Sequence, residues 1–376
     1  MRMRSQMEID LSLLASNYES LKKIAPNNEV LFMVKADAYG HGMVPVTRFS
    51  HHELGIKEFG CASIGEALRL REEIPDGEFE IYVFSDVQLM LKQATEIYLN
   101  YRVIPVISNE SNLDYFLETE EFKNFPLCLK FNTGMNRLGI DDSKAEEVID
   151  KIKRNGRREV YHLLSHFSSA SLPMDSNKKN LDQKKRFKEL KQKFIDSGIE
   201  LKKTSLSNSG AIEQGAGLDE THIRPGLMMF GPTSLIPKYR EKSKWDGKLI
   251  SSLETVIINS FDIQKGTPIG YGATPCPGNG AIAIIALGYG DGFSTRYQGV
   301  KLLHDGMEGQ IAGRVNMDMA QVFFEKQKAE QLNIGDKFVV WDHSSENFMR
   351  ICDQSRTIPY EVFIHVTQRV PKVYKI

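Results

Sequence analysis

The sequence predicts an α/β protein in which an N-terminal (β/α)8 barrel of the TIM type is followed by a mostly β C-terminal domain. Three observations support this fold class. The chain has 376 residues, a length that suits two domains with sizeable cores. Apolar β-rich runs alternate with amphipathic helical patterns from Val30 to about Gly231. Beyond Gly231 the helical periodicity fades and short β-rich runs follow one another.

Eight strand-like runs occupy the first part of the chain, and eight is the number that closes a (β/α) barrel. They are VLFMVK from residue 30, FGCAS from 59, FEIYVFS from 79, YRVIPVIS from 101, LCLKFN from 127, VYHLLS from 160, TSLSN from 204 and GLMMF from 226. Helical patterns between them include residues 64–73, 86–99, 143–154 and 178–197. This alternation is typical of a parallel sheet covered by helices, so a closed barrel is predicted.

A linker separates the two predicted domains. Pro232, Pro237 and the charged stretch KYREKSKWDGK interrupt the alternating pattern. The β-rich runs beyond it are LETVIINSFDI, AIAIIALGYG, GQIAGRV, AQVFFE and DKFVVWD. Because consecutive strands without helices do not fit the parallel barrel, residues 1–240 are predicted to form the barrel domain and residues 241–376 the β domain.

The composition argues against several functions. With 48 basic and 49 acidic residues, the chain has no overall charge that would attract nucleic acid or an anionic membrane. The lysine-rich stretch 178–203 carries apolar residues at helical spacing, which is typical of an outer helix. The first residues lack the apolar segment of a secretion signal, and the longest apolar run, residues 281–287, is too short to span a bilayer. A cytoplasmic protein is therefore predicted.

Neither the cysteines nor the histidines predict a metal site. The four cysteines are widely spaced without a C-x-x-C pair, so buried packing residues are predicted in place of disulfides or zinc ligands. His162 and His166 have the spacing of a helical ligand pair, but VYHLLSHF is rich in strand-forming residues and has no third ligand nearby. A strand with both histidines on one face is predicted, and no metal.

The stretch VLFMVKADAYGHG, residues 30–42, is the strongest candidate for the functional centre. Apolar residues lead to Lys35, and a short polar loop with Tyr39 follows. A buried strand closed by a turn places Lys35 at a strand's carboxyl end, where α/β folds keep their chemistry. Loss of solvation there lowers the pKa of a lysine, so its amine can act as a nucleophile and form a Schiff base. An ordinary surface lysine at a strand end is the alternative.

Three further stretches place anion-binding groups after predicted strands. In FNTGMNRLGI a glycine turn delivers Arg137, whose guanidinium can hold both oxygens of a small carboxylate. In SNSGAI, Asn208 and Ser209 begin a short predicted helix whose hydroxyl and N–H groups suit a phosphate. In IRPGLMMFG, Gly226 and Leu227 can offer backbone amides to the same phosphate. A surface ion pair for the arginine and a common Ser-Gly turn are the alternatives.

Stretches spread over nearly the whole chain resemble the alanine racemases, enzymes that use pyridoxal phosphate (PLP). They are VLFMVKADAYGHG, FNTGMNRLGI, LLSHFSSA, SNSGAI, IRPGLMMFG, ALGYGDGFST, GRVNMDMAQV and IPYEVFIHVTQRVPKVY. They follow the family's order and span both predicted domains. The resemblance implies a PLP-dependent isomerase that interconverts L- and D-alanine as a homodimer with two composite active sites.

The resemblance also implies roles for individual residues. Lys35 carries the cofactor and exchanges the α-proton on one face of the substrate. Tyr289 of the partner subunit, hydrogen-bonded to His166, serves the other face. The residues that the resemblance assigns to the substrate carboxylate are Arg137, Met317 and Asp318. The further cofactor contacts that it implies are Tyr39, His166, Asn208, Ser209, Arg224, Gly226, Leu227 and Tyr360.

Two of the matched residues concern charge, and three positions depart from the family pattern. Arg224 matches an arginine that faces the pyridine nitrogen and, because it keeps its proton, leaves the cofactor a weaker electron sink, which favours racemisation. Lys130 matches a lysine that is often carbamylated and steadies the carboxylate-binding arginine. Asn132 replaces the usual aspartate, Gly290 replaces alanine, and Asn316 stands where serine or cysteine is common.

Three other functions remain open at this point. A racemase of serine or another amino acid would share the same machinery. PLP decarboxylases share the two-domain plan but need an acid at the ring nitrogen, and Arg224 argues against them. Small PLP-binding barrel proteins without turnover consist of a single domain, whereas this chain has a second domain that carries Tyr289.

Overall fold

The computed structural model describes residues 4–376, apart from the side chain of Lys242. The predicted absence of a secretion signal also concerns residues 1–3, which lie outside the described residues. No helix in the described part of the chain is both long enough and apolar enough to cross a membrane.

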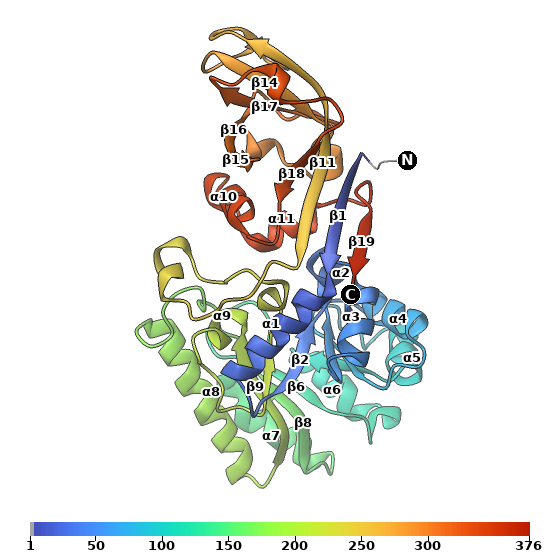
Figure 1. Ribbon diagram of the computed structural model, residues 1–376. Helices are drawn as coiled ribbons and strands as arrows, with labels where there is room; N and C mark the ends of the chain where they lie inside the picture. Colours follow the sequence, from blue (N-terminus) through green and yellow to red (C-terminus); the bar gives the residue numbers. More distant parts are fainter. Residues whose placement is uncertain (1–3) are drawn as a thin grey trace.

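Within the described residues, eight parallel strands close into a barrel in the lower part of Figure 1, which confirms the predicted fold class. Each strand pairs with the next, and the last returns to the first. The strands are β2 (Glu29–Met33), β3 (Glu58–Cys61), β4 (Glu80–Val83), β5 (Val103–Ile107), β6 (Cys128–Asn132), β8 (Glu159–Leu164), β9 (Glu200–Asn208) and β10 (His222–Arg224).

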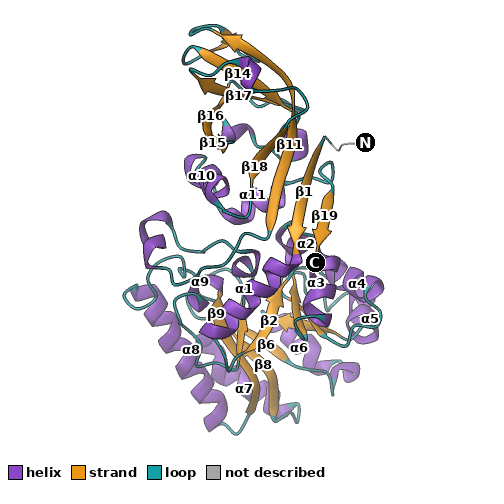
Figure 2. Cartoon of the chain, viewed as in Figure 1, coloured by secondary structure: helices purple, strands orange, loops and turns teal. Residues whose placement is uncertain are grey.

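Helices cover the outside of the barrel (Figure 2). They include α1 (Leu11–Ile24), α3 (Met43–His52), α4 (Ile64–Glu73), α5 (Lys92–Asn100), α6 (Glu110–Glu118), α7 (Ala145–Arg154) and α8 (Lys178–Asp196). Their apolar stripes face the strands, as in α8, where Phe187, Leu190 and Phe194 are buried. The lysine-rich stretch therefore forms an outer helix, as predicted.

Two predicted barrel features are wrong in detail. The eighth strand is His222–Arg224, and the predicted run GLMMF instead forms a 3-10 turn, η3 (Leu227–Phe230), whose residues are buried. The turn begins after Pro225, which has no N–H to donate to a ladder, and Gly226, whose N–H donates to the Ser209 hydroxyl. His162 lies in β8, but His166 lies two residues beyond the end of that strand.

The second domain is built on a long strand, β11 (Ser251–Ile263), which pairs with neighbours on both sides. The other strands of this sheet that follow β11 in the sequence are β14 (Gly280–Ile285), β15 (Lys301–His304), β16 (Met307–Ala312), β17 (Ala320–Glu325), β18 (Lys337–Trp341) and β19 (Lys372–Lys375). The domain also contains two helices that the sequence pattern did not predict, α10 (Glu346–Gln354) and α11 (Pro359–His365).

The chain begins in the second sheet. Strand β1 (Ser5–Asp10) pairs antiparallel with β11 and parallel with β19, so the first and last strands of the chain lie side by side (Figure 1). Met7 and Ile9 alternate with half-buried residues along β1 and are themselves fully buried. The first residues were predicted to belong to the barrel domain. In the structure, β1 instead pairs with two strands of the β domain. The division at residue 240 stays a prediction.

The second domain packs on the barrel next to the Lys35 stretch. Helix α11 places Tyr360 against Tyr39, with ring centroids 5.6 Å apart, and Phe363 against His41 at 4.5 Å. A Cβ added at Gly40, which has φ +84°, would lie 2.4 Å from the Phe363 carbonyl oxygen. Glycine is required there by both the backbone conformation and the approach of α11.

All four cysteines are buried and free, as predicted. Among the described residues, no group of three or more His, Cys, Asp and Glu side chains has an arrangement that could hold a metal ion.

Candidate active site at the barrel mouth

The predicted barrel residues meet at the carboxyl ends of five strands. Lys35 follows β2, Lys130 lies near the end of β6, His166 follows β8, Asn208 ends β9 and Arg224 ends β10. The carboxyl ends of parallel strands face one mouth of a barrel, which is the usual place for chemistry in this fold. Residues that are far apart in the chain therefore share one mouth of the barrel.

Lys35 opens a turn of unusual handedness. The segment α2 (Lys35–Tyr39) has left-handed backbone angles, with φ of 53° at Ala36, 54° at Asp37 and 53° at Ala38 and Tyr39. A left-handed turn costs about 1–2 kcal/mol per non-glycine residue. Such a conformation persists only where the surroundings impose it, and it is typical of functional sites. The polar loop predicted after Lys35 is thus a strained turn that sets the direction of both Lys35 and Tyr39.

Two carboxylates that the sequence analysis did not single out hold this turn. Glu66 accepts hydrogen bonds from the backbone N–H groups of Ala36 and Ala62, both at 2.7 Å. Asp37 accepts from the Met43 N–H at 2.9 Å and pairs with Lys372 at 2.7 Å. A signal for Glu66 existed, because Ser63 and Glu66 have the spacing of a helix capping box. Nothing local marked Asp37, whose partner lies at the other end of the chain.

The mouth holds a cluster of mutually repelling cations. Burial, the Arg137 guanidinium and, in the opposite direction, Glu66 act on Lys35, and the net effect lowers its pKa. Burial together with Arg224, Arg137 and Lys35 lowers the pKa of Lys130 to about 7. Both amines therefore lose their protons more readily than an exposed lysine, which is the property that a nucleophilic lysine needs.

Three cations of the mouth form no ion pair within the part of the chain that the structure describes. Among the described residues, Lys35, Lys130 and Arg137 form no ion pair with a carboxylate. Arg224 is fully buried, which lowers its pKa to about 10, and it donates to Ser205, to the Ser165 carbonyl and toward His166. Positive charge left unpaired in a half-buried site favours an anionic ligand.

His166 is neutral in this environment. Burial lowers the pKa of His166 well below its usual value, and the charges of Arg224 and Lys130 add to the effect. Its ring nitrogens lie 3.3 Å from Asn208 Nδ2 and 3.3 Å from an Arg224 nitrogen. The ring is thus fixed between the ends of β9 and β10, beside the cationic cluster.

Hydroxyl and backbone groups gather on the side of the mouth that faces α11. The Ser209 hydroxyl accepts from the Gly226 N–H at 2.9 Å and from the Met228 N–H at 3.3 Å. A Cβ added at Gly226 would lie 2.3 Å from the Tyr39 hydroxyl. Glycine at 226 therefore lets the tyrosine hydroxyl reach the backbone, and Tyr360 stands beside Tyr39.

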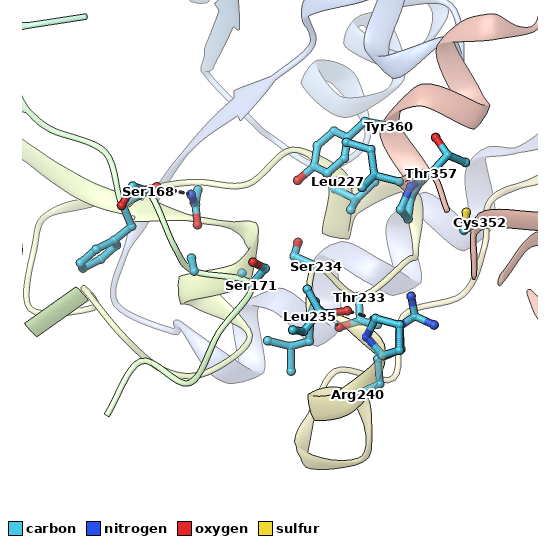
Figure 3. A pocket seen from close by; sticks show the side chains of 18 of the residues that line it. Ser168, Ser171, Leu227, Thr233, Ser234, Leu235, Arg240, Cys352, Thr357 and Tyr360 are labelled. Atoms are coloured by element: carbon cyan, nitrogen blue, oxygen red, sulfur yellow. Dashed lines mark hydrogen bonds between the residues drawn. The ribbon is translucent and has the colours of Figure 1, made fainter. Parts of the chain in front are cut away.

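A cavity of about 460 Å³ opens beside these groups (Figure 3). His166, Asn208, Leu227 and Tyr360 from the predicted cofactor set line it, whereas Lys35 does not. Figure 3 shows Ser234 of the linker and Tyr360 of α11 on the wall that the second domain completes. The hollow thus lies between the two domains and borders the barrel mouth, and its size suits a small cofactor or substrate.

Arg137 is exposed at the mouth, on a loop that Asn132 organises. The Asn132 side chain accepts from the N–H groups of Gly134 and Asn136 and donates to Asn136 Oδ1 at 2.9 Å. A carboxylate can accept the first two bonds but cannot donate the third. Asn132, which departs from the family pattern, therefore fits this loop, in which Asn136 has a left-handed φ of 55°.

Tyr289, Met317 and Asp318 form a separate group in the β domain. Tyr289 lies in η5 (Tyr289–Asp291), and its N–H donates to the Asn316 carbonyl at 2.9 Å. The Tyr289 and Met317 side chains are 45% and 54% exposed. Within residues 4–376 of one chain, the Tyr289 hydroxyl makes no hydrogen bond to His166. The structure therefore joins the barrel residues to one another but leaves this second group apart from them.

Fold and site together define a class of protein: a two-domain α/β-barrel protein with a lysine of lowered pKa in a cationic barrel mouth. Family models give the finer assignment. The alanine racemase N-terminal domain matches residues 9–234, and the alanine racemase C-terminal domain matches residues 250–374. The chain belongs to the alanine racemase family, a family of isomerases.

Individual relatives agree with this assignment. The chain is 31% identical to an alanine racemase of Carboxydothermus hydrogenoformans, and the match covers 98% of both chains. It is 30% identical to an alanine racemase of Clostridium kluyveri, over 98% of this chain and 93% of the relative. Among solved structures, the biosynthetic alanine racemase of Pseudomonas aeruginosa superposes with a TM-score of 0.82 at 26% identity, covering all of both chains.

A second solved structure shares the fold. It is the alanine racemase of Bartonella henselae with covalently bound pyridoxal phosphate, which superposes with a TM-score of 0.85 at 24% identity over the full length of both chains. The family assignment does not favour the decarboxylase or the non-enzymatic barrel protein.

Proposed function

We propose that this chain racemises alanine with PLP held at Lys35. The observation that carries the proposal is the unpaired cationic cluster around a lysine of lowered pKa, at the carboxyl ends of the barrel strands. The residues present fit the cofactor, since the Tyr39 and Ser209 hydroxyls lie against the Gly226 backbone, where they would donate to a phosphate, and the buried Arg224 at the end of β10 would face the ring. A relative of the same fold binds PLP covalently.

Different residues of the chain would hold the cofactor, exchange the proton and bind the substrate carboxylate. When bound, PLP would supply the electron-withdrawing ring that makes the α-proton of an amino acid exchangeable. Lys35 would hold the cofactor through its amine and then hold or release the α-proton at Nζ. Arg137, exposed at the mouth and without a carboxylate partner among the described residues, would fix the substrate carboxylate with two parallel hydrogen bonds. Arg224 keeps its proton because burial lowers its pKa only to about 10.

The second acid/base group is proposed to be Tyr289 of a partner subunit. Exchange of a proton on both faces of one carbon needs a group on each face, and Lys35 can occupy only one of them. The exposure of Tyr289 and Met317, and their separation from the barrel residues of their own chain, support a homodimer in which each β domain completes the other barrel's site.

A racemisation assay of the purified chain with added PLP tests this function. We expect L-alanine to be converted to the D-enantiomer, and D-alanine to the L-enantiomer, with equal kcat/KM because the two enantiomers have the same free energy. The assay is run against a panel of L-amino acids. Faster turnover of serine or another amino acid would replace alanine as the proposed substrate, and release of carbon dioxide would contradict racemisation.

Lys130 is proposed to carry a carbamate. Its pKa of about 7 leaves a neutral amine near physiological pH, and only the neutral amine adds to CO2. The amine nitrogen forms a bond to carbon and loses a proton, and the resulting anion would be stabilised by Arg137 and Arg224, which now repel the ammonium form.

Carbon-13 NMR in labelled bicarbonate checks this proposal. We expect a carbamate resonance that grows as the pH rises through about 7, because deprotonation of Lys130 produces the reactive form. The resonance should be absent in Lys130→Met and retained in Lys191→Met, in which a lysine paired with Glu220 is replaced. A signal that first appears near pH 10 would indicate an ordinary exposed lysine and contradict the assignment.

A further inference from the structure

A buried carboxylate follows Tyr289 and is held from both ends of the chain. The side chain of Asp291 is 2% exposed. One of its oxygens lies 3.2 Å from Arg369 Nε, and the other lies 3.4 Å from Arg4 Nη2 and accepts from the Gly288 N–H at 2.9 Å. The conformation of the Tyr289 loop is therefore tied to this carboxylate.

Arg369 extends the connection to a second loop. Its Nη2 lies 2.8 Å from Asp318 Oδ1, so one guanidinium bridges Asp291 and Asp318. The same two loops are joined by backbone hydrogen bonds, from Tyr289 N–H to the Asn316 carbonyl and from Gly290 N–H to the Met317 carbonyl, both at 2.9 Å. Arg369 thus closes a link between the loop of Tyr289 and the loop of Met317 and Asp318.

Gly290 provides the space that Arg369 occupies. A Cβ added at this position would lie 2.3 Å from Arg369 Nη1 and 2.9 Å from the Met317 carbonyl oxygen. The first contact can be relieved only if the arginine moves, and the second involves backbone that cannot move freely. The glycine that departs from the family pattern is therefore matched to the position of Arg369 in this chain.

We propose that Arg369 is a positioning residue for racemisation: its bridge between Asp291 and Asp318 fixes the Tyr289 loop, and Gly290 makes room for it. The inference rests on the proposed role of Tyr289 as an acid/base group. A proton donor must lie within hydrogen-bond reach of the reacting carbon, and a displacement of about 1 Å can cost on the order of 10²-fold in rate. A guanidinium suits this task because its planar fork can bind two carboxylates at once.

Hydrogen exchange of the chain tests the bridge without reference to activity. In Arg369→Met, the amides of Tyr289 and Gly290 should exchange at least about tenfold faster, because their bonds to residues 316 and 317 open more often. Gly290→Ala should give a similar change, and combining the two should add little because both remove the same contact. The matched control is Arg350→Met, since Arg350 bridges Glu308 and Glu346 elsewhere in this domain and should leave these amides unchanged.

Kinetics of the PLP-loaded protein test the positioning role. Impaired proton transfer at Tyr289 should change the α-deuterium isotope effects of L- and D-alanine in opposite directions, because each enantiomer presents its proton to a different group. We expect Tyr289→Phe to show this change strongly, Arg369→Met to show it with a fall in kcat of about 10–100-fold, and Arg369→Lys to recover part of the loss. A loss of folded protein alone would not alter isotope effects.

The outcomes separate the inference from the function on which it rests. If Tyr289→Phe changes the isotope effects and Arg369→Met leaves both them and the amide exchange unaltered, the positioning role is wrong and the function of Tyr289 stands. If Tyr289→Phe leaves both isotope effects at the values of the unmodified protein, the proposed role of Tyr289 is itself wrong, even where the exchange data support the bridge.

Discussion

Lys35→Ala is expected to lose at least about 10⁴-fold in racemisation rate, because one change removes both the group that holds the cofactor and one of the two proton-exchanging groups. The structure makes Lys35 suitable for this chemistry through burial and the nearby Arg137 guanidinium, which together lower its pKa. Borohydride reduction of the PLP-loaded protein, followed by peptide mapping, should place the reduced adduct on Lys35 in the unmodified chain and find none in the variant.

Three other lysines serve as controls for this experiment. Lys130 also has a lowered pKa, so an adduct mapped to Lys130 would contradict the assignment of the cofactor to Lys35. Burial alone would lower the pKa of Lys203, but Glu58 and Glu80 outweigh it and raise the pKa. The Lys203 peptide should therefore stay unmodified. Lys191→Ala, which removes a half-buried lysine of helix α8, should retain both activity and the adduct on Lys35.

Mixed chains of Lys35→Ala and Tyr289→Phe should be far more active than either variant alone. In a dimer with composite sites, a mixed pair contains one intact site, formed by Lys35 of one chain and Tyr289 of the other. Random exchange makes about half of the dimers mixed, so recovery should approach about one quarter of the unmodified activity. The exposure of Tyr289 on the β domain motivates this prediction.

Exchange of chains must be measured in the same samples, for example by native mass spectrometry of chains that carry different tags. Mixing Lys35→Ala with Arg137→Ala is the matched control, because both changes lie in the same barrel and leave every dimer without an intact site. Absence of recovery in the first mixture, with mixed dimers present, would mean that Lys35 and Tyr289 do not act in one composite site.

The barrel could be predicted largely from local sequence because each strand is a short apolar run followed by a turn. The run from Val30 led correctly to β2, and residues 64–73 coincide with helix α4. The eighth strand could not be placed in the same way. The run GLMMF is apolar because η3 is buried in the core, and burial alone does not distinguish a strand from a tight turn.

Only some of the charged residues at the barrel mouth could be predicted from the sequence. Lys35, Arg137 and Arg224 stood out through their positions after predicted strands, which the topology gathers at one end. The lowered pKa of Lys130 did not stand out, because it arises from burial and from three cations contributed by separate segments of the chain. Glu66 was missed for a related reason, since its hydrogen bond to Ala36 joins two βα units.

By itself, the sequence determined the fold class, the alanine racemase family and the lysine that opens the VKADAYGHG turn, because all three depend on residue types at short spacing. The tertiary structure alone decided the left-handed turn at Ala36, the place of β1 in the second sheet and the bridge made by Arg369. Each of these depends on groups far apart in the chain: Asp37 meets Lys372, β1 meets β19, and Asp291 meets Arg369. Such pairings are set by how distant segments pack together, either within the β domain or between it and the barrel, and no local pattern encodes them.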